Sequence, residues 1–304
     1  MFKPVCQACG QPIWGKYLSA LGTNWHPEHF CCAGCGRALK DGHFHLHNGS
    51  PFHSECYSQL IAPHCLYCGK ALMGKYLIDY WGTKYCPEHQ QFYPACAFCG
   101  RLVPNQPDSG NREVSCSVCQ SSSIQTSLEA RPLFLRVKQW ISNQGLVYNN
   151  LQLSLELCDR IRLAQLLHEH SQTHSWGATT SSTYMQDGQV VHPVVNGIAV
   201  LQGLPAVLFQ GVTAHELGHV WLIVHGIENL SNWGEEGFCE YLSHRYYCDL
   251  NIPESHYHAM CIESNPNPIY GEGFRRVRGM ADSLGFPHFL EILRTTKRLP
   301  PHQA

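Results

Sequence analysis

The arrangement of apolar and polar positions in this 304-residue chain changes near residue 120. Up to Cys119 the chain is dense in cysteine. A polar, serine-rich stretch, QSSSIQTS, follows and predicts a short linker. From Leu128 onward, apolar residues follow regular spacings. This change predicts separate structural units, and the length suggests two or three of them.

Three segments after the linker have the spacings of regular structure. LFLRVKQWI fits either a strand or a short helix. Residues 153–170 carry apolar side chains at helical spacing and predict an amphipathic helix. After a predicted loop, SWGATTSSTYMQDGQ, the alternating stretch VVNGIAVLQGLP predicts a strand.

Further helices are predicted in the C-terminal third of the chain. One begins at Pro205, because proline is favoured at the first helical position, and ends near Gly226, a typical helix terminator. It contains the motif HELGH. Two more helices are expected at residues 235–247 and 274–284.

Composition excludes some classes of function. The net charge is −2 and 14% of residues are charged, so we expect no basic surface for nucleic acid. No apolar run reaches the ~18 residues that span a membrane. The first residues, MFKPVCQACG, lack the pattern of a secretion signal. We therefore expect a cytoplasmic protein with reduced thiols.

The seventeen cysteines could form disulfides in a secreted protein, but their positions favour metal binding. Thirteen lie in the first 119 residues, mostly as Cys-x-x-Cys pairs with histidines nearby. Zinc takes four thiolate or imidazole ligands in a tetrahedron, and each pair can supply half of a site. The first two predicted ligand sets are Cys6, Cys9, His26, His29 and Cys32, Cys35, His53, Cys56.

Together with the W-H-P-x-x-F block, these two sets resemble a LIM domain, a tandem double zinc finger, over residues 4–60. His29 and His53 stand where cysteine is more common, and imidazole is also a zinc ligand. Cys31 is assigned no metal.

A second, LIM-like module follows. Its predicted ligand sets are Cys65, Cys68, Cys86, His89 and Cys96, Cys99, Cys116, Cys119. Six residues separate these sets, where a strict LIM domain has two. A single Cys-x-x-Cys pair could arise by chance or serve redox chemistry, but eight paired ligand ends with matching loop lengths predict four closed, structural zinc sites. LIM domains bind other proteins, so we expect this half to bind regulatory partners or to pack against the other half.

The HELGH motif predicts different metal chemistry. His215 and His219 share one helix face and can point at one metal. Glu216 can reach a water on that metal, whose pKa zinc lowers to ~7, and act as general base, as in zinc peptidases. The alternative is an ordinary buried helix, because a five-residue motif also occurs by chance.

Such a centre needs a third ligand and an open fourth position. The downstream stretch EEGF resembles the third-ligand segment of the gluzincins, which implies Glu236 as that ligand. Glu240, one turn later, can accept the second N–H of a ligating histidine. The alternative for Glu235 and Glu240 is a solvated helix carboxylate, which we favour for Glu235.

The gluzincin resemblance also implies an edge strand beside the zinc that holds the substrate as an added strand. A plain core strand is the alternative. The implied strand residues are Gly197, Ile198, Ala199 and Val200. Tyr270 is the candidate donor to the scissile carbonyl, with Arg275 and His244 behind it.

The LIM domain, the LIM-like module and the segments AHELGHVW, EEGFC and YGEGFR resemble, over nearly the whole chain, the LIM-domain peptidases that regulate organ size in plants. That resemblance implies a zinc-rich regulatory half joined to an endopeptidase that cleaves selected proteins and is activated by ubiquitination. Plant members carry ubiquitin-interacting motifs before the LIM domain. This chain starts almost at Cys6, so we expect a minimal relative without them.

We therefore predict an α+β multidomain protein. A LIM domain at 1–62 and a LIM-like module at 63–125, both with small β-hairpins, precede a mainly helical gluzincin-type metallopeptidase domain with a small sheet at 126–304. About five zinc ions are expected, four structural and one catalytic. The alternatives are a non-catalytic LIM adaptor, which has no need of the general base Glu216, and an aminopeptidase, for which no acidic patch is assignable.

Overall fold

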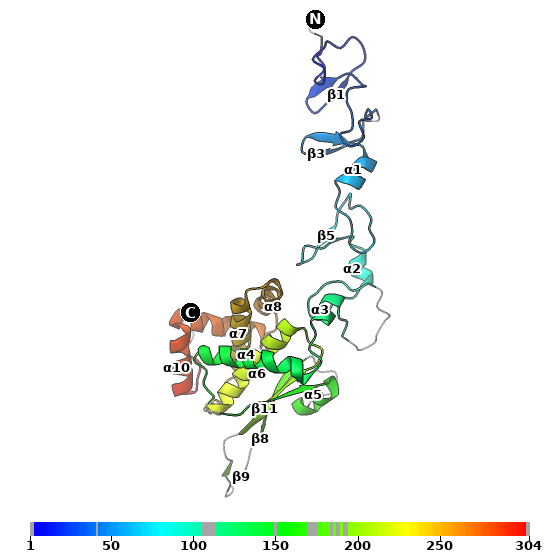
Figure 1. Ribbon diagram of the computed structural model, residues 1–304. Helices are drawn as coiled ribbons and strands as arrows, with labels where there is room; N and C mark the ends of the chain where they lie inside the picture. Colours follow the sequence, from blue (N-terminus) through cyan, green and yellow to red (C-terminus); the bar gives the residue numbers. More distant parts are fainter. Residues whose placement is uncertain are drawn as a thin grey trace. The chain divides into compact units, whose positions relative to one another are not determined.

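The computed structural model describes residues 3–40, 42–104, 113–148, 151–168, 175–182, 185–186, 189–190 and 194–301. The chain divides into two compact units, residues 1–94 and 95–304 (Figure 1). The first holds short hairpins and the second holds most of the helices and a small sheet. The predicted α+β class, with finger-like modules before a helical region, is thereby confirmed.

Three antiparallel hairpins and two short helices make up the first unit. Their bounds are β1 (Leu18–Ala20), β2 (Thr23–Trp25), β3 (His45–His47), β4 (Ser50–Phe52), β5 (Leu77–Ile78), β6 (Lys84–Tyr85), α1 (Ser54–Leu60) and α2 (His89–Phe92). A core cluster of this unit contains only Phe30, Cys32, Leu39 and Phe52 as buried members. So small an apolar core stabilises a fold weakly, which is why small finger modules depend on metal.

The second unit contains a three-stranded sheet with β11 (Val194–Leu201) in the middle. On one side β7 (Ser154–Cys158) pairs with it in parallel, and on the other β8 (Gly177–Ser182) pairs antiparallel. The strands β9 (Met185–Gln186) and β10 (Gln189–Val190) form a separate pair. The strand predicted from VVNGIAVLQGLP is confirmed.

Two sequence predictions in this region are wrong. The segment 153–170, predicted as one helix, begins as strand β7, and α5 (Arg160–Leu167) follows it. Asp159 separates them, because its side chain accepts the Arg162 N–H at 2.8 Å and caps the helix. Residues 169–170 lie outside the described residues. The predicted loop 175–189 contains β8, whose GATTSS sequence has no apolar alternation.

Helices form the rest of the second unit. They are α3 (Ser117–Ser121), α4 (Ser127–Asn143), α6 (Ala206–Val224), α7 (Asn232–Leu250), α8 (Pro253–Glu263), α9 (Gly271–Leu284) and α10 (Phe286–Thr296). LFLRVKQWI is helical, within α4, and Thr126 with Glu129 forms a capping box at the start of that helix. The serine-rich stretch before it is not a free linker. The Ile124 N–H donates to the Leu204 carbonyl at 2.9 Å, and the Ala206 N–H donates to the Ser122 carbonyl at 2.9 Å.

The HELGH motif lies on α6, the helix that begins after Pro205 as predicted. It contacts α4, α7, β8 and β11, so it is enclosed on several sides (Figure 1). Its apolar residues are therefore buried within the protein. Among the helices that the structure describes, none is both long and apolar enough to cross a membrane.

Glycines set how closely α7 packs against its neighbours. A Cβ on Gly218 of α6 would lie 2.9 Å from the Cys239 sulfur on α7. A Cβ on Gly237 of α7 would lie 2.3 and 2.4 Å from the backbone carbon and oxygen of Gly273 on α9. Real Cβ contacts are not this short, so the EEGF and YGEGF segments need glycine for α7 and α9 to cross at this distance.

Substituting Gly237→Ala should destabilise the second unit by about 1–3 kcal/mol, because the added methyl group meets backbone atoms that cannot move aside. The thermal unfolding midpoint of the full chain measures this loss. Gly279→Ala is the matched control on α9, because its Cβ would meet nothing within 4 Å. It should leave the midpoint unchanged or raise it, since alanine is the better helix former. Equal midpoints for both variants would contradict the close crossing.

Candidate metal sites and active-site cleft

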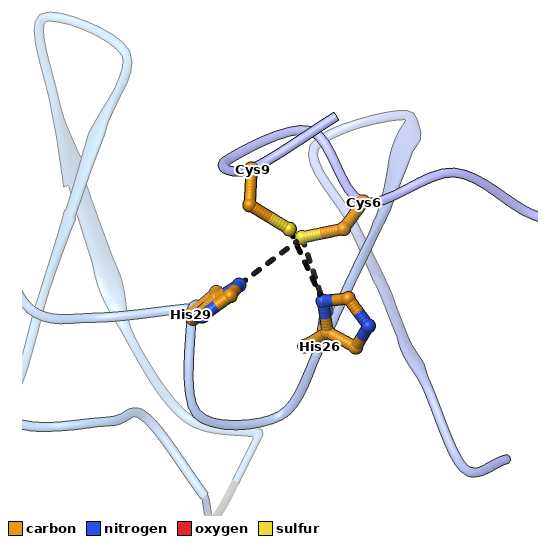
Figure 2. Close-up of side chains that lie close together, drawn as sticks. All are labelled: Cys6, Cys9, His26 and His29. Carbon is orange, nitrogen blue, oxygen red and sulfur yellow. Dashed lines mark hydrogen bonds between the residues drawn. The ribbon is translucent and has the colours of Figure 1, made fainter. Parts of the chain in front are cut away.

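The structure brings together each of the four predicted sets of Cys and His ligands. In every set the potential ligand atoms lie within 4.8 Å of one another. Figure 2 shows the first set, in which Cys6 Sγ lies 3.6 Å from His29 Nδ1 and Cys9 Sγ lies 3.4 Å from His26 Nδ1. Ligands of tetrahedral zinc stand roughly 3.3–3.8 Å apart for ordinary Zn–S and Zn–N bonds. The four clusters therefore fit zinc.

All four clusters share one backbone turn. The glycine directly after the first Cys-x-x-Cys pair of each cluster has φ of 70° or 71°, and its N–H donates to the carbonyl of the first cysteine at 2.8–3.0 Å. These glycines are Gly10, Gly36, Gly69 and Gly100. A left-handed residue closes the turn and leaves both sulfurs on one side. The repeated C-x-x-C-G pattern is therefore the sequence signal of these metal-binding turns.

Backbone N–H groups prepare the first cysteine of a pair to be a thiolate. Burial raises the pKa of Cys6, but N–H donors, led by His26 at 3.3 Å from its sulfur, outweigh burial and lower the pKa to about 5. The thiolate is the form that binds metal.

A fifth group of ligand atoms lies between α6 and α7. The Nε2 atoms of His215 and His219 are 3.2 Å apart, and Glu236 Oε2 lies 3.2 Å from the first and 3.6 Å from the second. A tetrahedral zinc with two imidazoles and a carboxylate would hold these atoms roughly 3.3 Å apart. The three predicted ligands therefore fit one zinc ion.

Cys239 offers a competing donor that the sequence did not reveal. Its sulfur also lies within 4.8 Å of a ring nitrogen of each histidine. However, Cys239 is fully buried beside Gly218 and does not line the cleft. Burial raises the pKa of Cys239 to about 12. Glu236, which lines the cleft, is the better third ligand.

The other ring nitrogens of the histidines face two further carboxylates. His219 Nδ1 lies 3.0 Å from Glu235 Oε1, and His215 Nδ1 lies 3.5 Å from Glu240 Oε1. Glu240 stands where the sequence placed it. Glu235, expected to be a solvated helix carboxylate, instead contacts a histidine ring. Both contacts point the Nε2 atoms at a common position.

Three glutamates surround the two histidines, and this arrangement of charges favours binding of a cation. Burial lowers the pKa of His215 and raises that of Glu236. Their mutual attraction outweighs burial, so the pKa of His215 is raised and that of Glu236 falls well below its usual range. Burial also raises the pKa of Glu240. A divalent cation would neutralise this excess of carboxylates, and the donor set suits zinc.

Glu216 lies beside the histidines and is held by β8. Its side chain is 6% exposed, and Thr179 Oγ1 lies 2.8 Å from its Oε2 and 3.0 Å from its backbone oxygen. A Cβ on Gly177 would lie 2.6 Å from Glu216 Oε1, so this glycine lets the strand pass directly over the carboxylate. Neither Gly177 nor Thr179 was singled out from the sequence, because the stretch around them was predicted as a loop.

The strand predicted to receive substrate is not at an edge. Strand β11 lies between β7 and β8, so both of its sides are paired. This applies to all four predicted residues, Gly197, Ile198, Ala199 and Val200. The edge strand next to Glu216 is β8. The physical reason is that β8 pairs with β11, a contact between segments separated in sequence, which local periodicity does not report.

A cleft of about 990 Å³ opens over the histidine pair. Its lining includes His215, Glu216, His219, Glu235, Glu236, Glu240, Tyr270, Asn265, Trp176, Phe98 and Tyr257. Tyr270 therefore shares the cleft with the candidate ligands. His244 and Arg275, expected behind it, do not line this cleft and make other contacts. His244 Nε2 contacts Glu263 Oε1 at 2.9 Å, and Arg275 donates to the carbonyls of Glu263 and Asn265.

Comparison with known proteins gives matches in both parts of the chain. The LIM domain family profile matches residues 6–61, and the DA1-like family profile, described as Protein DA1, matches residues 154–253. Protein DA1 of Arabidopsis thaliana is 25% identical over 97% of this chain and 68% of its own length.

Two further relatives agree. Protein DA1-related 1 of Arabidopsis thaliana is 26% identical over 97% of this chain and 66% of its own length. The LIM domain-containing protein HDR3 of Oryza sativa subsp. japonica is 28% identical over 83% of this chain and 58% of its own length. The chain thus spans about two thirds or less of these relatives. The predicted resemblance is confirmed: residues 6–61 match the LIM domain, residues 154–253 match the DA1-like family, and the chain is similar over most of its length to plant DA1 proteins.

Proposed function

We propose that this chain is a zinc-dependent endopeptidase that cleaves selected proteins. The observation that carries the proposal is the placement of His215, His219 and Glu236, with mutual distances of 3.2–3.6 Å, in a cleft that also contains Glu216. The four Cys/His clusters fit structural zinc, and the LIM modules are the proposed sites for regulatory partners. Ubiquitin is one candidate partner.

The zinc would act as a Lewis acid and lower the pKa of a water in its open position to ~7. The chain's own residues supply the rest. Glu216 takes up a proton at its carboxylate and later gives it to the leaving amine. Thr179 fixes that carboxylate through the 2.8 Å contact with Oε2. Tyr270 is the proposed donor to the substrate's carbonyl oxygen.

The substrate would bind as an extended segment along β8. This strand is paired with β11 on one side only among the described strands, so its other edge can pair with a peptide. Gly177 and Thr179 place that edge next to Glu216. An extended backbone laid there would bring a peptide bond close to the general base.

Glu216→Gln should lower the rate of cleavage of a generic unfolded protein by roughly 10²–10⁴-fold, because it removes the general base and keeps the shape. Glu254→Gln, on the exposed first turn of α8, is the control and should cleave like wild type. Zinc content should be equal in all three proteins. Equal cleavage by wild type and Glu216→Gln would refute the assigned mechanism. If neither the wild type nor Glu216→Gln cleaves the substrate, the result would favour a non-catalytic adaptor.

The metal-loaded chain should contain about five zinc ions, two in each finger module and one at the histidine pair. Mass spectrometry of the metal content measures this number. His215→Ala should lower this number by one. Mild chelation of the wild-type chain should remove the ion at His215 and His219 first, because it has only three protein ligands. A total near two would contradict the finger assignment.

A further inference from the structure

One wall of the cleft is formed by the fourth zinc cluster. Ala97 and Phe98, the two residues between Cys96 and Cys99, line the same cavity as the histidine pair. This cluster belongs to the second compact unit, together with the cleft. Its metal-binding turn is therefore placed where a substrate would lie.

Phe98 packs against Trp176, the residue just before β8, the proposed substrate-binding edge strand. Its ring lies 6.3 Å from that of Trp176 in a T-shaped arrangement, a favourable geometry for aromatic pairs. Trp176 directly precedes Gly177, the residue that lies against Glu216. The aromatic pair therefore lies next to the general base.

The same turn also meets the opposite side of the cleft. A Cβ on Gly100 would lie 2.6 Å from the hydroxyl oxygen of Tyr257, which is on α8 and lines the cleft. Gly100 is the left-handed glycine of the turn. The turn thus lies between Trp176, just before β8, and Tyr257 of α8.

The fourth cluster is held more firmly than the other three. All four of its cysteines are buried, whereas each of the other clusters has one exposed cysteine, namely Cys9, Cys35 or Cys68. Glu113, just before the second cysteine pair, forms an ion pair with Arg160 at 2.7 Å. Ser122 and Ile124, just after it, are hydrogen-bonded to the start of α6 and the turn before it.

We propose that the Cys96–Cys119 cluster forms a metal-dependent specificity subsite. The metal-bound turn holds Phe98 against Trp176, and this apolar wall receives a large apolar side chain of the substrate next to the scissile bond. The preferred substrates are therefore extended segments with a bulky apolar residue at that position. The inference rests on the proposed peptidase cleft, but it concerns peptide binding and can be tested without catalysis.

Peptide binding to the Glu216→Gln full chain tests the subsite. The probe is a fluorescein-labelled, ten-residue Gly/Ser peptide with one central phenylalanine, compared with the same peptide carrying alanine. The phenylalanine peptide should bind roughly tenfold more tightly, as expected for burial of one large apolar side chain. Adding Phe98→Ala should reduce this ratio to below about threefold, at unchanged zinc content. Phe98→Leu, which keeps an apolar side chain, should retain most of the ratio and so exclude a general folding defect.

Two controls separate the subsite from other effects. Phe92→Ala, at a 75% exposed position in the first unit, should leave the ratio unchanged. Cys99→Ser should lose one zinc ion and the preference, whereas Cys68→Ser should lose one zinc ion and keep the preference. The proposal would be overturned if the Glu216→Gln chain bound both peptides with equal affinity. It would also be overturned if adding Phe98→Ala left the ratio of the two affinities unchanged. Cleavage of unfolded protein by wild type would still support the peptidase in that case.

Discussion

The close approach of α6 and α7 is the constraint on which the candidate site depends. Two histidines on one helix form a three-ligand zinc site only if a third donor from elsewhere in the chain reaches the same point. Gly218 allows this because Cys239 of α7 lies directly against its Cα. Gly237 and Gly273 then let α9 cross α7 from the other side. Because glycine has no side chain, the backbones can approach closely at these positions. Helix α7 is thereby packed between α6 and α9.

The electrostatics of the site follow from this packing. Bringing α7 close places Glu235, Glu236 and Glu240 around two histidines in a largely buried region. Buried carboxylates are unfavourable unless they are paired. The histidines compensate for part of the charge, and a divalent cation would compensate for the rest. Packing and charge therefore both favour metal binding at the same point.

The Cys/His clusters of the two units lie in different surroundings. In the first, Cys/His clusters supplement a core of very few buried apolar residues. In the second, the helices bury a large apolar core, yet one Cys cluster is retained, and its turn borders the cleft. We infer that its position next to Phe98 and Trp176 gives it a part in shaping the cleft.

The sequence by itself determined the features that depend on local spacing. Cys-x-x-Cys turns, the His215 and His219 pair and the Glu236 and Glu240 pair each lie within a few residues, so turn and helix geometry fix their relation. The structure brings all four finger clusters and the three proposed ligands together as predicted. The end of α6 near Gly226 was predictable for the same reason, since the chain reverses there with a left-handed glycine.

Only the tertiary structure decided the features that depend on contacts distant in sequence. Strand β8 lies next to Glu216 because it pairs with β11, and GATTSS carries no pattern that shows this. Glu235 faces His219 because of how α7 is rotated against α6. Phe98 lines the cleft because the turn of the fourth cluster packs against Trp176, just before β8, and against Tyr257 of α8. Periodicity reports which face of an element is buried but not which element covers it. Features set by local spacing could therefore be predicted from the sequence, and features set by contacts between distant segments could not.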